Sequence, residues 1–408
     1  MNIFTRHSLL TLSLILVFQI HSSVIFSQKI TVENKAAQEV KDYTLEIPVA
    51  GLNLSFGHYT ATVNGQIVPV EIIKKTDGND YAVIPVDKIG AKGKIDVSLQ
   101  KGFASAYPKR TYAELSHKIG GHFEGHKYVG GYSWVKPNYI TLPGSFRDHS
   151  YYIKYEGPGW ESDKVAFRFY LDNRNAIDVF AKKTAGIVLP AVGVDGFDNY
   201  HNMADWGMDN LKVGKALGLG SIAVWDGEKA VRVEKKDSVT CLIAADGKVR
   251  SQVKTIYYGW DANGKKSDLT SLISIDAGSR ASHMALSIDG EIDNIATGII
   301  KSKNAELIVG KQAKGKWSYI ATFGKQSLNN DMQGLVVFFP VDKVKEITED
   351  ALNHVVVLDA KDGFAEYYFM PTWELDNDPV ATKEKLLECI DEVLLRLNNP
   401  LAYTIKKK

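Results

Sequence analysis

Eight Asn-Gly or Asp-Gly pairs constrain the fold of this chain more than any other feature of its sequence. Both residues of such a pair tolerate positive φ, which the two-residue turns of β-hairpins require. The runs between the pairs, such as TIYYGW (255–260) and HVVVLDA (354–360), are rich in β-branched and aromatic residues. We therefore expect an all-β protein whose strands pair mainly antiparallel. The pairs begin at Asn64, Asp77, Asp195, Asp226, Asp246, Asn263, Asp289 and Asp362.

The composition of the chain changes at about residue 102. Residues 28–102 consist of short strand-like runs with few histidines or aromatic residues, which predicts a small N-terminal β-sandwich. Aromatic residues become denser from residue 103, and residues 103–408 predict one large catalytic domain. Near its end we expect a helix that Asp378 caps, with Pro379 in the first turn and leucines recurring on one face. A shorter helix is expected over residues 342–352.

The first 27 residues have the pattern of a secretory signal. A basic start, MNIFTRH, precedes the apolar run LLTLSLILVF and a serine-rich region that ends at Ser27. We expect a periplasmic or secreted protein without a membrane span after cleavage, with an uncleaved anchor as the alternative. The 49 basic and 48 acidic residues show no concentrated basic face, so nothing indicates a nucleic-acid partner. Cys241 and Cys389 allow at most one disulfide and exclude a cysteine-ligated zinc site.

The stretch GGHFEGHKYVGGYSW (120–134) gathers two histidines and a glutamate between glycines. Side chains alternate along a strand, so a strand would place His122, Glu124 and His126 on one face. Such a set can bind a divalent cation, but the zinc-protease motif and its general base are absent. A catalytic or sugar-contacting role and a purely structural role are the alternatives. No cofactor is assigned beyond this candidate cation.

Arginines and aromatic residues are concentrated between residues 145 and 180, where Arg147, His149, Arg168 and Arg174 occur. The planar guanidinium of arginine can bind a carboxylate or sulfate through two hydrogen bonds. Arg168 is the strongest candidate because AFRFYLD alternates, so that one face of its strand is either functional or buried. A salt bridge to a neighbouring carboxylate is the structural alternative for each arginine.

A third cluster lies in DNYHNMADWGMDN (198–210), with Tyr200, His201, Asp205 and Trp206. This composition is typical of a structured loop over a cleft rather than of a core element. His201 is the strongest single catalytic candidate. The alternative is an imidazole that only makes a structural hydrogen bond.

Three long segments of the chain resemble a family of secreted bacterial proteins that is labelled as a domain of unknown function and encoded among polysaccharide-degradation genes. They are RTYAELSHKIGG (110–121), YEGPGWESDKVAFRFYLDNRNAIDVF (155–180) and HNMADWGMDNLKVGKALGLGS (201–221). The resemblance implies a large antiparallel super-β-sandwich of the galactose-mutarotase-like kind, as in sugar epimerases and several polysaccharide lyases. Its member of known activity dehydrates oligosaccharides of ulvan, so the resemblance also implies a carbon–oxygen lyase whose partner is a sulfated uronate-rhamnose oligosaccharide. Residues 366–378 depart from the pattern of the family.

A dehydratase of this type would remove water across C4 and C5 of a non-reducing-end glucuronate or iduronate and leave a 4,5-unsaturated uronate. Arg168 or His122 would meet the negative charge that grows on the carboxyl group. His201 or Tyr200 would take the C5 proton, and His122, His126 or a tyrosine would protonate the leaving hydroxyl. The residues expected to bind the rest of the substrate are Arg147, His149, Trp134, Trp160, Asp205, Trp206 and Trp373.

Two other classes of function are compatible with these residues. A polysaccharide lyase or a glycoside hydrolase would act on the acidic polymer, and the hydrolase would need two opposed carboxylates. A binding module would hold acidic oligosaccharides without turnover and would need no group of histidines. The occurrence of His122, His126 and His201 within one region favours catalysis.

Overall fold

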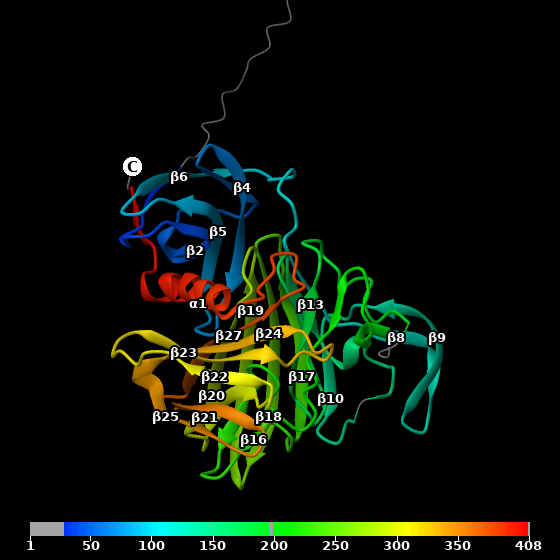
Figure 1. Cartoon of the computed structure of the whole chain (residues 1–408). Coiled ribbons are helices and arrows are strands. Elements are labelled where there is room, and N and C mark those ends of the chain that lie inside the picture. The colour runs from blue at the N-terminus through cyan, green and yellow to red at the C-terminus, as the bar shows by residue number, and fades with distance from the viewer. Residues whose placement is uncertain (1–27, 148, 196–198, 407–408) are drawn as a thin grey trace, which may run out of the picture.

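The computed structural model describes residues 28–147, 149–195 and 199–406. The predicted secretory signal, residues 1–27, lies outside the described residues. Within this part of the chain the strands of each sheet pair antiparallel and one α-helix follows near the C-terminus, so the predicted all-β fold is confirmed. Figure 1 shows a smaller N-terminal part stacked on one end of a larger sandwich, from which a two-stranded hairpin projects.

The N-terminal part is a seven-stranded sheet of order β2-β5-β4-β3-β6-β1-β28 with an apolar core of its own. Its last member, β28, pairs with β1 and comes from the C-terminal end of the chain. The predicted large domain, residues 103–408, therefore does not include all of its expected C-terminal end. Strand β28 belongs to the N-terminal sheet, so the two ends of the described chain meet there. The strands are β1 (Gln28–Glu33), β2 (Val40–Pro48), β3 (Tyr59–Val63), β4 (Gln66–Lys74), β5 (Asp80–Ile89), β6 (Lys94–Lys101) and β28 (Ala402–Ile405).

The larger part is built on a nine-stranded sheet of order β10-β17-β18-β19-β20-β27-β24-β23-β22. The strands of this sheet are β10 (Ile140–Pro143), β17 (Ser238–Asp246), β18 (Arg250–Ala262), β19 (Lys265–Asp276), β20 (Ser282–Gly290), β22 (Ala305–Val309), β23 (Trp317–Lys325), β24 (Met332–Pro340) and β27 (Phe364–Trp373).

Two five-stranded sheets and a hairpin complete the larger part. The first sheet, of order β14-β13-β12-β11-β7, contains β7 (Thr111–Glu114), β11 (Gly159–Ser162), β12 (Ala166–Phe169), β13 (Ile177–Lys182) and β14 (Gly207–Asp209). The second, of order β16-β15-β21-β26-β25, contains β15 (Ala223–Trp225), β16 (Ala230–Arg232), β21 (Asn294–Ile300), β25 (Val344–Glu349) and β26 (Asn353–Asp359). The hairpin pairs β8 (His117–Glu124) with β9 (Lys127–Val135).

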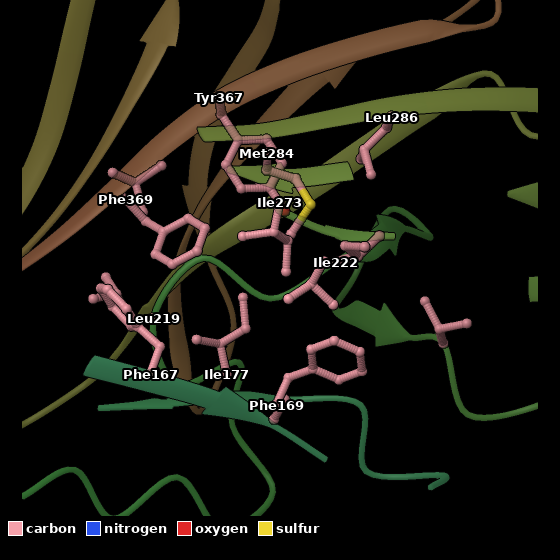
Figure 2. Packing of buried hydrophobic residues seen from close by; sticks show 14 of the residues in the cluster. Phe167, Phe169, Ile177, Leu219, Ile222, Ile273, Met284, Leu286, Tyr367 and Phe369 are labelled. Carbon is pink, nitrogen blue, oxygen red and sulfur yellow. The ribbon is translucent and has the colours of Figure 1, made fainter. Parts of the chain in front are cut away.

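The main core fills the space between the nine-stranded sheet and the sheet of β7 and β11–β14. Figure 2 shows Phe167, Phe169 and Ile177 facing residues of β19, β20 and β27, among them Met284 and Phe369. These side chains are at most 3% exposed, and removal of apolar surface from water stabilises by about 25 cal/mol per Å². Because side chains alternate along a strand, the residues between them on β12 and β13 point to the opposite, outer face.

The helix α1 (Lys383–Asn398) starts later than predicted. Thr382 rather than Asp378 is its N-cap, since the Thr382 side chain accepts a hydrogen bond from the backbone N–H of Lys385. Asp378 instead accepts from Arg280. Leu386 belongs to the apolar cluster between the helix and the outer face of β23 and β24. The described helices include none long and apolar enough to cross a membrane.

The predicted short helix over residues 342–352 is wrong. A 3-10 turn at Val341–Lys343 leads directly into strand β25. That strand pairs with β26, and the partnership across the sheet overrides the weak helical pattern of the segment.

Candidate functional site

Charged side chains line the outer face of the sheet of β7 and β11–β14, beneath the segments of residues 149–157, 183–195 and 199–206. Arg168 on β12 lies directly opposite Asp178 on β13, so both point to the same face. Asp209 ends β14, the neighbour of β13. All three residues are at most 1% exposed. Charges at this depth need partners, and the covering segments supply further ones.

Arg168 is the centre of this arrangement. Its Nη1 donates to Glu156 Oε2 at 2.8 Å and to the Tyr200 hydroxyl at 2.9 Å. Its Nη2 donates to Asp178 Oδ2 and to Asp209 Oδ2, each at 3.0 Å. We define the Arg168 cluster as Arg168, Glu156, Tyr170, Asp178, Tyr200 and Asp209.

Aromatic rings enclose the guanidinium within the cluster. Its central carbon lies 4.4 Å from the ring centre of Tyr170, 5.1 Å from that of Tyr200 and 5.6 Å from that of Phe180. The Tyr170 hydroxyl accepts from Arg168 Nη2 and donates to Asp178. Cation–π contacts of this kind add to the ion pairs when the cation is removed from water.

The cluster holds three carboxylates against one guanidinium, and this imbalance affects their protonation. Burial raises the pKa of Asp209 well above its ordinary value, and the neighbouring Asp178 raises it further. Burial also acts to raise the pKa of Glu156, but Arg168 and Arg174 together lower it. Burial and Asp178 thus favour the protonated form of Asp209, whereas the two guanidinium groups favour the ionised form of Glu156.

Two histidines connect the buried cluster to solvent. The Nδ1 atom of His201 lies 3.3 Å from Asp209 Oδ2, and the imidazole is 41% exposed. The Nδ1 atom of His149 lies 3.2 Å from Glu156 Oε1, and this imidazole is 58% exposed. The Nδ1 atom of each histidine thus contacts a carboxylate that also accepts a hydrogen bond from Arg168, and this contact orients the imidazole ring. This is an arrangement suited to proton transfer.

Arg174 lies beside His149 at the rim. Its Nη1 is 3.2 Å from His149 Nε2, and its Nη2 donates to Glu156 at 2.8 Å and to Asp172 at 2.7 Å. The side chain is 21% exposed, so Arg174 presents a cation to the surface next to an imidazole.

The backbone of the segment that carries His149 is strained. A positive φ is uncommon for residues other than glycine and costs of order 1–3 kcal/mol when the residue is strained, and such residues cluster at functional sites. The hairpin holds this segment in place, because the Tyr128 N–H donates to the carbonyl of Ser150 and the Lys118 N–H to that of Tyr152. The residues with positive φ here are His149, Tyr151, Tyr155 and Glu156, with φ of 64°, 63°, 45° and 65°.

Two of the predicted catalytic residues are present at the site but cannot act as predicted. Arg168 is 0% exposed and both of its Nη atoms donate to protein groups, so it cannot meet a substrate carboxylate and acts by positioning others. Tyr200 is 2% exposed, and burial raises the pKa of its phenol well above the ordinary value. Tyr200 is therefore no base at neutral pH, and both expectations are corrected.

His122 and His126 are not part of the Arg168 cluster. Both are exposed on the projecting hairpin, where His122 Nε2 lies 3.0 Å from Glu124 Oε1 of the same strand. Among the described residues, no group of three or more His, Cys, Asp or Glu side chains is arranged to hold a metal ion, and His122, Glu124 and His126 do not form one.

The predicted tryptophan platforms divide into buried and partly exposed side chains. Trp160 and Trp373 are each 1% exposed, so neither can stack on a sugar, and this expectation is corrected. Their indole N–H groups donate to Ser282 and Asp331 within the protein. Trp134 and Trp206 are half-buried.

The remaining predicted binding residues lie at the surface. Trp134 donates to the carbonyl of Val194 at 3.3 Å, which ties the hairpin to the segment over the site. Arg147 is exposed and donates to the carbonyls of Gly144 and Phe146. Asp205 is exposed in the turn before β14.

Neither Glu156 nor Asp178 was predicted from the sequence to have a role, although both accept hydrogen bonds from Arg168. The signal for Asp178 was present, since a carboxylate within the apolar run NAIDVFA is buried if the run is a strand and then requires a cation. The same face of the sheet carries two further buried ion pairs, Lys154 with Glu114 at 3.1 Å and Lys182 with Glu161 at 2.9 Å. Cys241 and Cys389 are both free.

Comparison with known proteins shows one family. The family described as "Domain of unknown function (DUF4861)" matches residues 32–402. The "Uncharacterized protein P7" of Formosa agariphila is 25% identical over 275 residues, which are 60% of this chain and 66% of that protein. The chain thus spans slightly less than two thirds of the length of this curated relative.

Two solved structures from Enterococcus faecalis align with most of the chain. One is a protein in the glycosyl hydrolase family 38, with a TM-score of 0.45, and the other is an alpha-mannosidase, with a TM-score of 0.47. Each is 8% identical to this chain and covers 93% of it. The chain spans 47% and 46% of their lengths, about half of each.

Proposed function

The chain belongs to the DUF4861 family, and from the Arg168 cluster we propose that it is a dehydratase of acidic oligosaccharides. It removes water from the non-reducing-end glucuronate or iduronate of sulfated ulvan oligosaccharides and leaves a 4,5-unsaturated uronyl residue. The observation that supports the chemistry is that one buried cluster orients two exposed imidazoles through two different carboxylates. The sequence resemblance supports the substrate and, with the signal pattern, a periplasmic or secreted location.

His149 and Arg174 supply the base and the carboxylate contact in this proposal. In the free protein Nε2 of His149 faces an N–H of Arg174 at 3.2 Å. A uronate carboxylate that draws this guanidinium toward itself frees Nε2 to take the proton from C5, the carbon that bears the carboxylate. Negative charge that grows on the carboxylate during proton removal then faces Arg174.

His201 supplies the acid. Hydroxide is a poor leaving group, so the C4 hydroxyl must be protonated as its bond to carbon breaks. The raised pKa of Asp209 favours a proton on this side of the cluster, and the imidazole of His201, 3.3 Å away, carries it to the surface. Together the two histidines remove H⁺ from C5 and add H⁺ to the departing hydroxyl, so one water leaves and no charge accumulates.

The experiment is an incubation with saturated uronyl-rhamnose-sulfate oligosaccharides, followed by near-ultraviolet absorbance and product mass. Loss of one water with a new conjugated chromophore is the expected result. His201→Ala and His149→Ala should each lower kcat by about 10²–10⁴-fold, the usual contribution of a general acid or base. His126→Ala is the matched control, because this exposed histidine lies outside the cluster, and it should keep full activity.

The same incubation separates the alternatives. Cleavage of the chain into shorter fragments would make the protein a lyase or a hydrolase, and an unchanged substrate that still binds would make it a binding module. Full activity in both His149→Ala and His201→Ala would contradict the proposed mechanism. A hydrolase is disfavoured because the carboxylates of Glu156 and Asp209 are only 4% and 1% exposed and are held by Arg168.

A further inference from the structure

Two adjoining cavities lie on the other side of the nine-stranded sheet from the Arg168 cluster. They have volumes of about 300 and 480 Å³ and share Arg250, Ser274, His283 and Glu366 as lining residues. The sheet forms their floor, and the N-terminal part and α1 form their walls (Figure 1). Met284 of β20 faces the main core, so the adjacent His283 faces these cavities.

The floor of the cavities is a furrow of small and polar side chains. Gln252 on β18 and Ser274 on β19 are direct neighbours on this floor, and the same row continues through His283 on β20 and Tyr368 on β27, which form one side of the furrow. The small side chains of Ser274, Ala285 and Ser287 leave the depression between bulkier residues. Where a sheet face only packs against another part of a protein, close-packed side chains fill the space between them. Here two cavities remain on the face instead.

One wall of the furrow is aromatic. The imidazole of His283 stacks on the ring of Tyr368 with centroids 4.3 Å apart and an angle of 21° between the planes. Trp317 meets the same tyrosine edge-on at 5.3 Å. His283 Nε2 also lies 3.0 Å from Glu366 Oε2, so imidazole and carboxylate present polar atoms beside the rings.

The innermost charges of the cavities are already paired with each other. Arg250 donates to Asp276 through Nε at 2.5 Å and Nη2 at 2.7 Å, and to Glu46 through Nη1 at 2.5 Å. Lys75 also pairs with Glu46. Burial acts to raise the pKa of Glu46, but Arg250 and Lys75 lower it to about 2, so Glu46 stays ionised. Because Arg250 is only 8% exposed and its charge is neutralised by two carboxylates, it does not favour an anionic ligand.

We propose that the furrow is a second carbohydrate site that binds an uncharged sugar residue. Hydroxyl groups of the sugar bond to the carboxylate of Glu366 and to the polar floor at Gln252 and Ser274. An apolar face of its ring packs against the aromatic wall at His283. The cavity volumes lie in or near the range of small-molecule sites, about 300–1,000 Å³. The inference is independent of the proposed catalytic function, since the two sites lie on opposite sides of the sheet.

The test uses the full chain and ligand-observed saturation-transfer NMR with L-rhamnose, D-xylose, D-glucose and D-galactose, each titrated separately. At least one of these sugars should bind saturably. Ser274→Phe, which fills the furrow, should abolish that binding. His283→Ala, which removes part of the wall without adding volume, should weaken it at least tenfold. His58→Ala is the matched control, because this histidine is exposed and lies outside the cavities.

Absence of saturable binding for all four sugars would overturn the inference and leave a hydrated interface between two parts of the protein. Binding that survives both Ser274→Phe and His283→Ala would overturn it as well. If Ser274→Phe fails to fold, His283→Ala decides. His201→Ala should leave this binding unchanged while it abolishes dehydration, so failure of one proposal is distinguishable from failure of the other.

Discussion

Replacement of Arg168 by methionine would show how strongly the buried cluster depends on its single central cation. Methionine keeps the length and much of the apolar volume of the side chain but removes the charge and every donor. In the native structure the guanidinium donates to Glu156, Asp178 and Asp209 at 2.8–3.0 Å. All three carboxylates remain buried after the substitution, and only Glu156 keeps another cation, Arg174 at 2.8 Å.

The expected loss of stability follows from these contacts. Removal of one partner from a buried ion pair costs about 3–5 kcal/mol, because the other charge remains buried without compensation. Two carboxylates lose their cation here and a third loses one of two, so we expect a loss of about 5 kcal/mol at neutral pH. Total stabilities of about 5–15 kcal/mol make this a large fraction, and the variant would be at or near the limit of folding.

The loss of stability in Arg168→Met also depends on pH. Without Arg168, burial raises the pKa of the carboxyl groups in the folded state above their unfolded values, which are about 4. Groups shifted in this way stabilise the fold below the unfolded pKa, and that contribution disappears as the pH rises through the folded pKa. The deficit of Arg168→Met relative to the natural protein is therefore smallest near pH 4 and grows toward neutral pH.

The assay is urea unfolding followed by tryptophan fluorescence at a series of pH values. Urea is preferred to guanidinium chloride because it adds no ionic strength, which would screen charges. Arg147→Met is the matched control, since Arg147 is exposed and, among the described residues, donates to the carbonyls of Gly144 and Phe146, and it should stay within about 0.5 kcal/mol of the natural protein. A deficit below about 1 kcal/mol for Arg168→Met at neutral pH, or one that is constant with pH, would refute the reasoning.

Three further predictions concern other parts of the molecule. Gly220→Ala should lower stability by about 1–3 kcal/mol more than Gly214→Ala in thermal unfolding, because both glycines have positive φ but only at Gly220 would the new Cβ meet a core phenylalanine ring, at 2.5 Å; equal losses would contradict this. Burial raises the pKa of Asp376 to about 7, so the contribution of this carboxyl group to stability is lost as the pH rises from about 4 through 7. Asp376→Asn should therefore flatten the fall of the unfolding free energy over this pH range, and an unchanged slope would speak against the assignment. Burial raises the pKa of the Cys241 thiol to about 12, so iodoacetamide should label native protein only at Cys389, as intact mass would show, and rapid native labelling of Cys241 would be inconsistent with the core.

The Asn-Gly and Asp-Gly pairs predicted where hairpins form better than they predicted which strands share a sheet. Five of the Asn-Gly and Asp-Gly pairs mark short connections, of two to five residues, between strands that pair with each other, because a short connection leaves the flanking strands side by side. The pair at Asp362 instead joins β26 to β27, which belong to different sheets, and that at Asp289 joins β20 to β21 in the same way. A turn fixes the direction of the chain, whereas distant core residues decide the sheet. The five pairs that connect paired strands begin at Asn64, Asp77, Asp226, Asp246 and Asn263.

At the site, residue type was easier to predict than burial. The sequence analysis placed Arg168, Tyr200 and His201 in the site, and the structure brings them together with His149. The sequence alone could not show that Arg168 and Tyr200 lie under covering segments, because burial depends on how residues 149–157, 183–195 and 199–206 fold over the sheet. The same limit applies to Trp160, since a tryptophan in an apolar run fits a core and a sugar platform equally well.

The Arg168 cluster is a poor means of stabilising a protein, which is an argument that it serves the site. A buried ionic group is seldom more stable than an apolar replacement of the same volume. Among the described residues, no hydrogen-bond partner lies within reach of Arg168 Nε or Asp209 Oδ1, so the network is also not fully satisfied. Strained backbone at His149 and Glu156 adds a further cost in the same place. Imperfect pairing, strain and two solvent-facing imidazoles coincide here, and the orientation of His149 and His201 accounts for all three, whereas stability alone accounts for none.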